Sequence, residues 1–174
     1  MRYSSYDSPI GHLLLVCSDR GLAEISFDYD RLRLQKAASN EAWIRDDAAL
    51  HPCRRELQEY FAGSRHEFTQ PLDLKGTAFQ LRCWNALLEI PYGETCSYAD
   101  LARKVGSPKG FRAVGMANHD NPIPIIVPCH RVITSDRKLG GYGGGLDLKE
   151  KLLRLEGARW CEPHPELFAA VSSR

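Results

Sequence analysis

The feature that most constrains this chain is a proline-rich apolar segment, NPIPIIVPCHRVI, at residues 121–133. Pro122, Pro124 and Pro128 exclude a regular helix here, because proline lacks an amide hydrogen and its ring collides with the preceding turn. The pattern predicts a stiff, largely buried segment that holds the adjacent Cys129 and His130 in one place. Free cysteine is among the residue types most often buried in protein cores, so the segment alone does not distinguish a reactive thiol from a structural one.

The neighbours of Cys129 favour a reactive thiol. His130 follows it directly, Asn121 lies upstream, and the glycine-rich stretch GGYGGG occupies residues 140–145. A nearby base or positive charge favours the thiolate, which is the reactive form of cysteine. Glycines allow backbone amides to approach a ligand without intervening side chains. Together these residues predict a pocket beside a nucleophilic cysteine.

Cysteine and histidine usage argues against disulfides and metal. The six cysteines occur singly, without a C-x-x-C pair, and the six histidines are equally dispersed. Reduced thiols and no structural metal are therefore expected. No apolar run approaches the roughly 20 residues of a membrane-spanning helix, and the start MRYSSYDSPIG does not resemble a secretory signal. We expect a cytoplasmic protein that does not associate with membranes.

The charge is distributed unevenly along the chain. The net charge is only +1, but residues 103–138 carry 7 Lys and Arg against 2 Asp and Glu, whereas residues 1–75 carry 10 against 12. A local basic excess is compatible with an ordinary solvated face or with binding of phosphates. The charge pattern alone does not decide between these two interpretations.

The first part of the chain has the pattern of a small α/β domain. The segment SPIGHLLLVCSDRGLAEISFDY contains two β-rich runs joined by a Ser-Asp-Arg-Gly turn, which predicts a hairpin. Helices are predicted around residues 30–38 and in HPCRRELQEYFAG, which closes with Gly63. The segment SRHEFTQPLDLKGT is the candidate linker. We place the domain boundary near residue 75, giving domains 1–75 and 76–174.

The second part is mainly helical. TAFQLRCWNALLEI predicts a helix that stops before Pro91, and SYADLARKVG predicts one capped by Ser97 and Asp100 and ended by Gly106. The turn SPKG then leads into the helix FRAVGMANHD, so the order is that of a helix-turn-helix. Helix pairs of this shape also occur in proteins that never touch DNA.

Several motifs resemble one family. PCHRVI, preceded by RAVGMANHDNPIPIIV and followed by GGYGGGLDLKEKLLRLEG, is similar to the active-site signature of the O6-alkylguanine-DNA alkyltransferases, also called methylated-DNA–protein-cysteine methyltransferases. The resemblance is continuous from about residue 77 to residue 157. It implies a ribonuclease H-like α/β domain followed by a mainly α, winged-helix-like domain with a helix-turn-helix. It also implies direct-reversal DNA repair without a cofactor. An alkyl group, typically methyl, would pass irreversibly from O6-alkylguanine, or from O4-alkylthymine, to the protein's own cysteine.

The resemblance implies a role for five residues in the chemistry. Cys129 would be the nucleophile, and His130 would take its proton through water. Glu156 would orient and polarise His130. Tyr98 would donate to the departing guanine, and Asn121 would stabilise the turn beside the cysteine.

Other residues would hold the base and the DNA. The carbonyls of Cys129 and Val132 and the amide of Gly143 would bind the flipped base, with Tyr142 as a wall of the pocket. The partner would be double-stranded DNA, approached from the minor groove by a monomer, with cooperative assembly along DNA left open. Arg112 would fill the space left by the flipped base, beside the small residues Ala113, Gly115 and Ala117 of a slim recognition helix. Met116 departs from the family pattern, because a small residue is usual at its position.

Two other functions are compatible with the residues alone. A cysteine hydrolase would also use a cysteine and a histidine, although such enzymes usually place the two far apart in sequence. A damage-recognising DNA-binding module with an unreactive thiol is the other alternative. Turnover separates the three, because a hydrolase yields many products, an alkyltransferase at most one per chain, and a binding module none.

Overall fold

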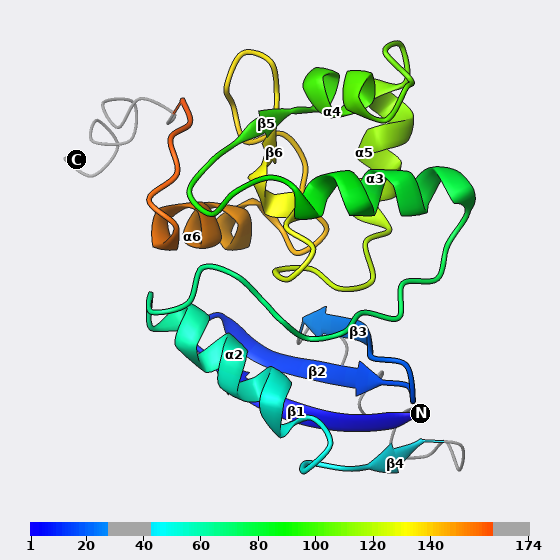
Figure 1. Cartoon of the computed structure of the whole chain (residues 1–174). Helices are drawn as coiled ribbons and strands as arrows, with labels where there is room; N and C mark the ends of the chain where they lie inside the picture. The colour runs from blue at the N-terminus through cyan, green and yellow to red at the C-terminus, as the bar shows by residue number, and fades with distance from the viewer. Residues whose placement is uncertain (28–42, 162–174) are drawn as a thin grey trace, which may run out of the picture.

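The computed structural model describes residues 1–27 and 43–161 of the chain, so the helix predicted around residues 30–38 lies outside the described residues. In the described part of the chain, a small sheet covered by a helix forms one half of the molecule, and a group of helices and loops forms the other (Figure 1). None of the helices in the described ranges is long and apolar enough to cross a membrane.

The sheet has the strand order β3-β2-β1-β4. The strands are β1 (Arg2–Ser8), β2 (Gly11–Cys17), β3 (Leu22–Phe27) and β4 (Ile44–Arg45). The predicted hairpin is confirmed, because β2 and β3 pair antiparallel and the Ser18 amide donates to the Gly21 carbonyl at 2.9 Å. The sequence reasoning missed β1, whose residues RYSSYDS include few apolar side chains to mark a strand.

Helix α2 (His51–Phe61) packs on the sheet and confirms the helix predicted in this segment. Its buried side chains include Leu57 and Tyr60, and Gly63 follows its end with a φ of 73°. After α2 the chain enters the predicted linker, which is held against the sheet. The Leu22 amide donates to the Pro71 carbonyl at 2.8 Å, and the Asp73 amide donates to the Leu22 carbonyl at 2.7 Å.

The helical half contains the predicted helix-turn-helix. The described elements of this half are α3 (Ala78–Leu88), β5 (Cys96–Ser97), α4 (Tyr98–Lys104), α5 (Phe111–His119), the short 3-10 helix η1 (Cys129–Arg131), β6 (Val132–Ile133) and α6 (Leu146–Leu155). The helix-turn-helix is the pair α4 and α5. Ser97 and Asp100 form the predicted capping box at the start of α4, and Gly106 follows its end with a φ of 74°. The Trp84 indole of α3 donates to the Ala117 carbonyl at 2.8 Å and thereby fixes α5.

The core is continuous between the two halves. One cluster of buried apolar residues includes Leu15 and Leu57 from the sheet half and Leu87 and Leu152 from the helical half. The Ile25 amide of β3 also donates to the Pro122 carbonyl at 2.9 Å. The sheet half therefore contacts the proline-rich segment directly and contributes to its position.

Candidate active site

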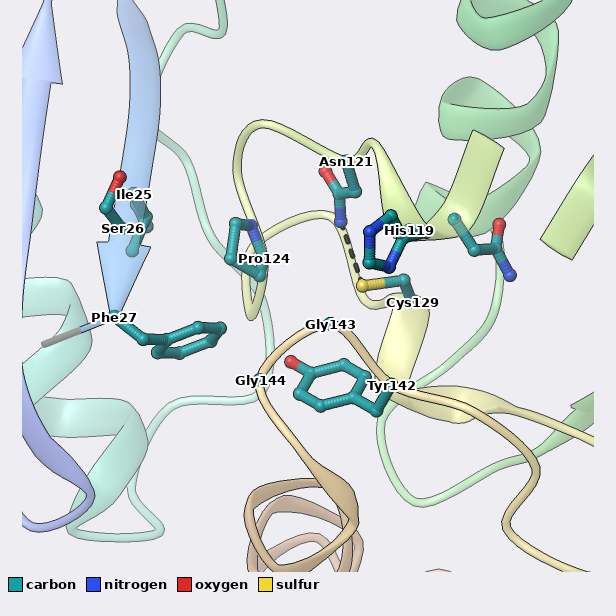
Figure 2. Close-up of a pocket in the computed structure, with 11 residues that line it drawn as sticks. Ile25, Ser26, Phe27, His119, Asn121, Pro124, Cys129, Tyr142, Gly143 and Gly144 are labelled. Atoms are coloured by element: carbon teal, nitrogen blue, oxygen red, sulfur yellow. Dashed lines mark hydrogen bonds between the residues drawn. The ribbon is translucent and has the colours of Figure 1, made fainter. Parts of the chain in front are cut away.

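The side chain of Asn121 organises the proline-rich segment. Its Oδ1 accepts a hydrogen bond from the Ile123 amide at 3.0 Å, and its Nδ2 donates to the Val127 carbonyl at 2.7 Å and to Sγ of Cys129 at 3.1 Å. Figure 2 shows Asn121 reaching across its own loop to the thiol. Ile125 in the same loop has a φ of 77°, a backbone conformation that side-chain-bearing residues rarely adopt. The loop is thus built to hold the thiol in place.

Cys129 is buried, with 6 % of its surface exposed. Burial raises the pKa of its thiol, whereas the hydrogen bond from Asn121 and the positive charge of Lys149 act in the opposite direction. The resting thiol is therefore protonated. Groups that stabilise a thiolate are already in place around it, so a base could complete its activation.

Two cavities share Cys129 as a wall. The smaller one, of about 280 Å³, extends to Phe27 of β3 and to Pro124, and includes Gly143 and Gly144. The larger one, of about 660 Å³, is mostly apolar and opens along α4 and α5. Asn118, His119, Cys129 and Tyr142 line both cavities. Figure 2 shows the smaller cavity, with the Tyr142 ring facing the thiol region.

The imidazole of His130 and the carboxylate of Glu156 form a fully buried pair. His130 Nε2 lies 2.7 Å from Glu156 Oε1, and both side chains have no exposed surface. Burial lowers the pKa of His130, and this effect outweighs the opposing hydrogen bond to Glu156. The other ring nitrogen, Nδ1, is buried and has no partner among the described residues. A neutral imidazole with a free nitrogen can accept a proton.

Other groups besides His130 also donate hydrogen bonds to Glu156. Arg131 donates to it through Nε at 2.8 Å and Nη2 at 3.0 Å, the Tyr60 hydroxyl at 2.7 Å, and the Gly93 amide at 3.3 Å. Burial raises the pKa of Glu156, but the hydrogen bonds from His130 and Arg131 and the charge of Arg131 outweigh it, and the pKa falls to about 2. The carboxylate is therefore ionised throughout the physiological range.

Lys149 of α6 is a second buried cation near the thiol. Its Nζ donates to the carbonyl oxygens of Val132 at 2.6 Å and Gly141 at 3.2 Å, and also to that of Leu139. Burial lowers its pKa to about 8, and the neighbouring Cys129 acts in the opposite direction. The Val132 carbonyl, which the sequence reasoning assigned to the flipped base, thus already accepts one hydrogen bond and has one lone pair left.

Two tyrosines border the larger cavity. The Tyr98 hydroxyl donates a hydrogen bond to the Gly141 carbonyl at 3.1 Å. The pKa of Tyr98 is raised mainly by burial and also by the nearby Cys129. Burial likewise raises the pKa of Tyr142, whose hydroxyl has no hydrogen bond of normal geometry within the described part of the chain. The ring centroids of Tyr142 and Phe27 lie 6.3 Å apart, so β3 supports the wall of the cavity that Tyr142 forms.

The proposed DNA-contacting residues lie on α5. Arg112 and Ala113 are exposed in its first turn, and Gly115 is half-buried. Arg112 and Gly115 line the larger cavity together with Met116, a residue that is 60 % exposed. A Cβ at Gly115 would lie 4.0 Å from the Tyr98 ring, so α4 and α5 approach each other closely here.

The structure thus gathers the predicted residues around one thiol. Most of them line one or both of the cavities: Cys129, Tyr98, Tyr142, Gly143, Asn121, Arg112 and Gly115. Two of them, Ala113 and Val132, line neither cavity. His130 and Glu156 form the buried pair behind them.

Sequence reasoning missed four residues of this site: Tyr60, Asn118, Arg131 and Lys149. Arg131 lies within the PCHRVI motif, directly after His130, and this position was the one signal in the sequence that pointed to it. The amide of Asn118 is buried in the walls of both cavities, and neither its nitrogen nor its oxygen has a hydrogen-bond partner among the described residues.

Within residues 1–27 and 43–161, no group of three or more His, Cys, Asp or Glu could hold a metal ion.

Comparison with known proteins places this site in a family. A family model described as 6-O-methylguanine DNA methyltransferase, ribonuclease-like domain, matches residues 1–74, and the corresponding DNA binding domain matches residues 78–158. The chain belongs to the 6-O-methylguanine DNA methyltransferase family. Its two parts are accordingly a ribonuclease-like domain and a DNA-binding domain.

Individual relatives agree with this assignment. A methylated-DNA–protein-cysteine methyltransferase of Methanosarcina acetivorans is 46 % identical over 158 residues, covering 91 % of this chain and 99 % of that protein. One of Mycobacterium tuberculosis is 47 % identical over 159 residues, covering 91 % and 94 %. The crystal structure of Mycobacterium tuberculosis OGT in complex with DNA is similar with a TM-score of 0.82 and 46 % identity, covering 90 % of this chain and 93 % of that one.

The buried network predicts how stability depends on pH. The pKa of Glu156 is lowered to about 2, so its contribution is present above its ordinary value of 4.5 and is lost as pH falls from there towards 2. The lowered pKa of His130 adds a loss of stability that begins below its ordinary value of 6.5. Glu156→Gln should lose about 3 kcal/mol at pH 7, because Arg131 keeps a buried charge without its counter-ion.

Chemical denaturation from pH 8 to pH 3 measures this prediction. The free energy of unfolding of the parent should fall steeply below pH 4.5, and that of Glu156→Gln should be lower at pH 7 and flatter below pH 4.5. Parallel curves for the two proteins would contradict the assignment of the acid-labile stability to Glu156.

Proposed function

We propose that this chain repairs DNA by direct reversal, transferring an alkyl group, typically methyl, from O6 of guanine in double-stranded DNA irreversibly to Cys129. The observation that carries the proposal is the buried thiol of Cys129 in the walls of two cavities, next in sequence to the buried His130–Glu156 pair. The names of the relatives support the same reaction. Their methyltransferase activity makes a hydrolase or a non-reactive binding module the less economical interpretation.

The reaction is a displacement at the alkyl carbon. His130 Nδ1 takes the thiol proton through an intervening water, while Glu156 stabilises the imidazolium through Nε2. The thiolate forms the S–C bond as the O6–C bond breaks, and the electron pair of that bond stays on guanine. Tyr98 donates a proton towards the departing base and is reprotonated from the imidazolium side, so the thiol proton ends on guanine. The thioether product is not hydrolysed, and each chain therefore acts once.

The substrate pocket is formed by the walls around Cys129. We propose that the flipped base lies against Tyr142, with the Gly143 amide and the carbonyls of Cys129 and Val132 at its polar edges. Small residues are needed here, because a Cβ at Gly144 would come within 2.7 Å of Leu148 and 3.1 Å of Phe27. O4-alkylthymine is a second candidate base for the same pocket.

DNA binding is assigned to α5. Its exposed Arg112, beside Ala113 and Gly115, enters the duplex from the minor groove and occupies the space of the flipped nucleotide, offsetting an extrusion that costs a few kcal/mol. Met116 would lie at the same interface, as its 60 % exposure allows. We propose that the protein acts in the cytoplasm as a monomer. A sigmoidal isotherm for its binding to DNA would instead indicate cooperative assembly along the DNA.

Replacing the nucleophile tests the proposal directly. Cys129→Ser should abolish transfer of a labelled methyl group from an O6-methylguanine duplex, because a hydroxyl at this position is a far weaker nucleophile than a thiolate. DNA affinity should stay within about threefold of the parent, because α5 and the adjoining loops hold the duplex. Cys161→Ser, which alters an exposed cysteine, is the control and should transfer normally. Labelled protein in the Cys129→Ser reaction would sink the mechanism.

Removing the base tests the role of His130. His130→Ala should slow single-turnover transfer by roughly 10²–10⁴-fold, the range that general-base assistance supplies. His51→Ala, which removes an exposed imidazole at the start of α2, should react like the parent. Rapid-quench kinetics at pH 7 gives both rates, and a His130→Ala rate within twofold of the parent would remove this residue from the proton transfer.

The role of Arg112 is tested by comparing two substrates. Arg112→Ala should react slowly with O6-benzylguanine in a duplex but almost normally with the free base, because only the duplex requires extrusion. Arg55→Ala, which alters an exposed arginine on α2, is the control and should leave both rates unchanged. Equal slowing with both substrates would show that Arg112 supports the pocket rather than the flipped-out state of DNA.

A further inference from the structure

The phenol of Tyr60 reaches the active-site carboxylate from the other half of the molecule. Tyr60 lies on α2, 96 residues before Glu156, and its hydroxyl donates to Glu156 Oε1 at 2.7 Å. The same oxygen also accepts from His130 Nε2 at 2.7 Å and from Arg131 Nη2 at 3.0 Å. A residue of the ribonuclease-like domain therefore shares one carboxylate oxygen with the imidazole beside the reactive cysteine.

The surroundings of Tyr60 leave its hydroxyl little freedom. The side chain is fully buried, and its ring centroid lies 5.3 Å from those of Phe61 and Phe68 and 6.1 Å from that of Tyr92. Burial raises the pKa of Tyr60, so the phenol stays protonated and acts as a donor. Aromatic packing thus aims a permanent donor at Glu156.

Donors that share one carboxylate oxygen compete for its negative charge. Each hydrogen bond to the ionised form stabilises that form and weakens its attraction for the other donors. The Tyr60 hydroxyl therefore fixes the direction of the carboxylate and also reduces the stabilisation that Glu156 gives to a protonated His130. Both effects favour a neutral, correctly oriented imidazole.

We propose that Tyr60 is a positioning residue of the alkyl-transfer site, supplied by the ribonuclease-like domain, which holds Glu156 and keeps His130 ready to accept the thiol proton. This inference rests on the role of His130 in the proposed function and extends it. It gives the first domain a part in the chemistry that acts through Glu156, in addition to its packing against the second.

The charged and titratable groups around the pair come from several elements. They are Tyr60 of α2, Tyr92 of the loop after α3, Cys129 and Arg131 of η1, Tyr142 of the glycine-rich loop and Lys149 of α6. Arg131 and Lys149 both oppose protonation of His130. A single change at Tyr60 leaves all the other groups in place.

Tyr92 provides a matched control for Tyr60. Its hydroxyl donates to the Leu155 carbonyl at 3.1 Å, one residue before Glu156, and does not donate to the carboxylate. Tyr92→Phe therefore removes one part-buried phenol hydrogen bond from the same region, whereas Tyr60→Phe removes a buried one. Thermal denaturation checks that both variants are folded and measures how far each is destabilised.

The two variants should differ in the titration of His130. In Tyr60→Phe the carboxylate is shared by fewer donors, so its bond to His130 strengthens and the pKa of His130 rises by about half a unit to one unit, the effect of one hydrogen bond. The acid limb of the pH–rate profile of alkyl transfer should move up equally. Below that limb Tyr60→Phe should react about three- to tenfold more slowly than the parent, and Tyr92→Phe should match the parent.

NMR of histidine-labelled protein measures the pKa of His130, and single-turnover kinetics measures the acid limb. Where a variant unfolds before His130 titrates, the resonance of the Nε2 proton at neutral pH reports the same hydrogen bond and should move downfield only in Tyr60→Phe. Equal His130 resonances and equal pH–rate profiles in the two variants would overturn the proposal. A His130 shift confined to Tyr60→Phe without any movement of the acid limb would retain the contact between Tyr60 and Glu156 but reject His130 as the base.

Discussion

The buried carboxylate of Glu156 is the interaction on which the rest of the site depends. It accepts hydrogen bonds from Tyr60, from the Gly93 amide and from the adjacent His130 and Arg131, which come from three separate parts of the chain. An ionised carboxylate in a core costs several kcal/mol unless such partners surround it. Because those partners are present, the same group ties the two domains together and leaves one ring nitrogen of His130 free for proton transfer.

The thiol obeys a second constraint, which is that it must be inert before the substrate arrives and reactive afterwards. Burial keeps Cys129 protonated, while Asn121 and Lys149 already provide the interactions that a thiolate needs. The proline-rich loop makes this possible, because its backbone conformation directs both the Asn121 amide and Sγ to the same point. The buried thiolate charge therefore forms only when a proton acceptor and an alkyl group are both in place.

Local patterns in the sequence were sufficient for the elements that carry the reactive residues. The capping pair at Ser97 and Asp100, the glycine that ends α4 and the prolines before Cys129 all act over a few residues, so they can be read directly. Tyr60 could not be found in this way, because its significance depends on a contact with Glu156 across 96 residues. Nothing in the local sequence LDLKEKLLRL distinguishes Lys149 from a surface lysine, and only the fold shows it buried against three carbonyl groups. Strand β1 was missed because its pairing with β2 matters more than its own weakly apolar residues.

The most direct test of the account is the intact mass of the parent protein after incubation with a duplex that contains one O6-methylguanine. The account predicts that each chain gains one methyl group, that peptide mapping places it on Cys129, and that no more than one lesion is repaired per chain. Repair of several lesions by a protein of unchanged mass would indicate hydrolysis, and binding without any change in protein or DNA would indicate a recognition module. Either result would contradict the transfer of the alkyl group to Cys129.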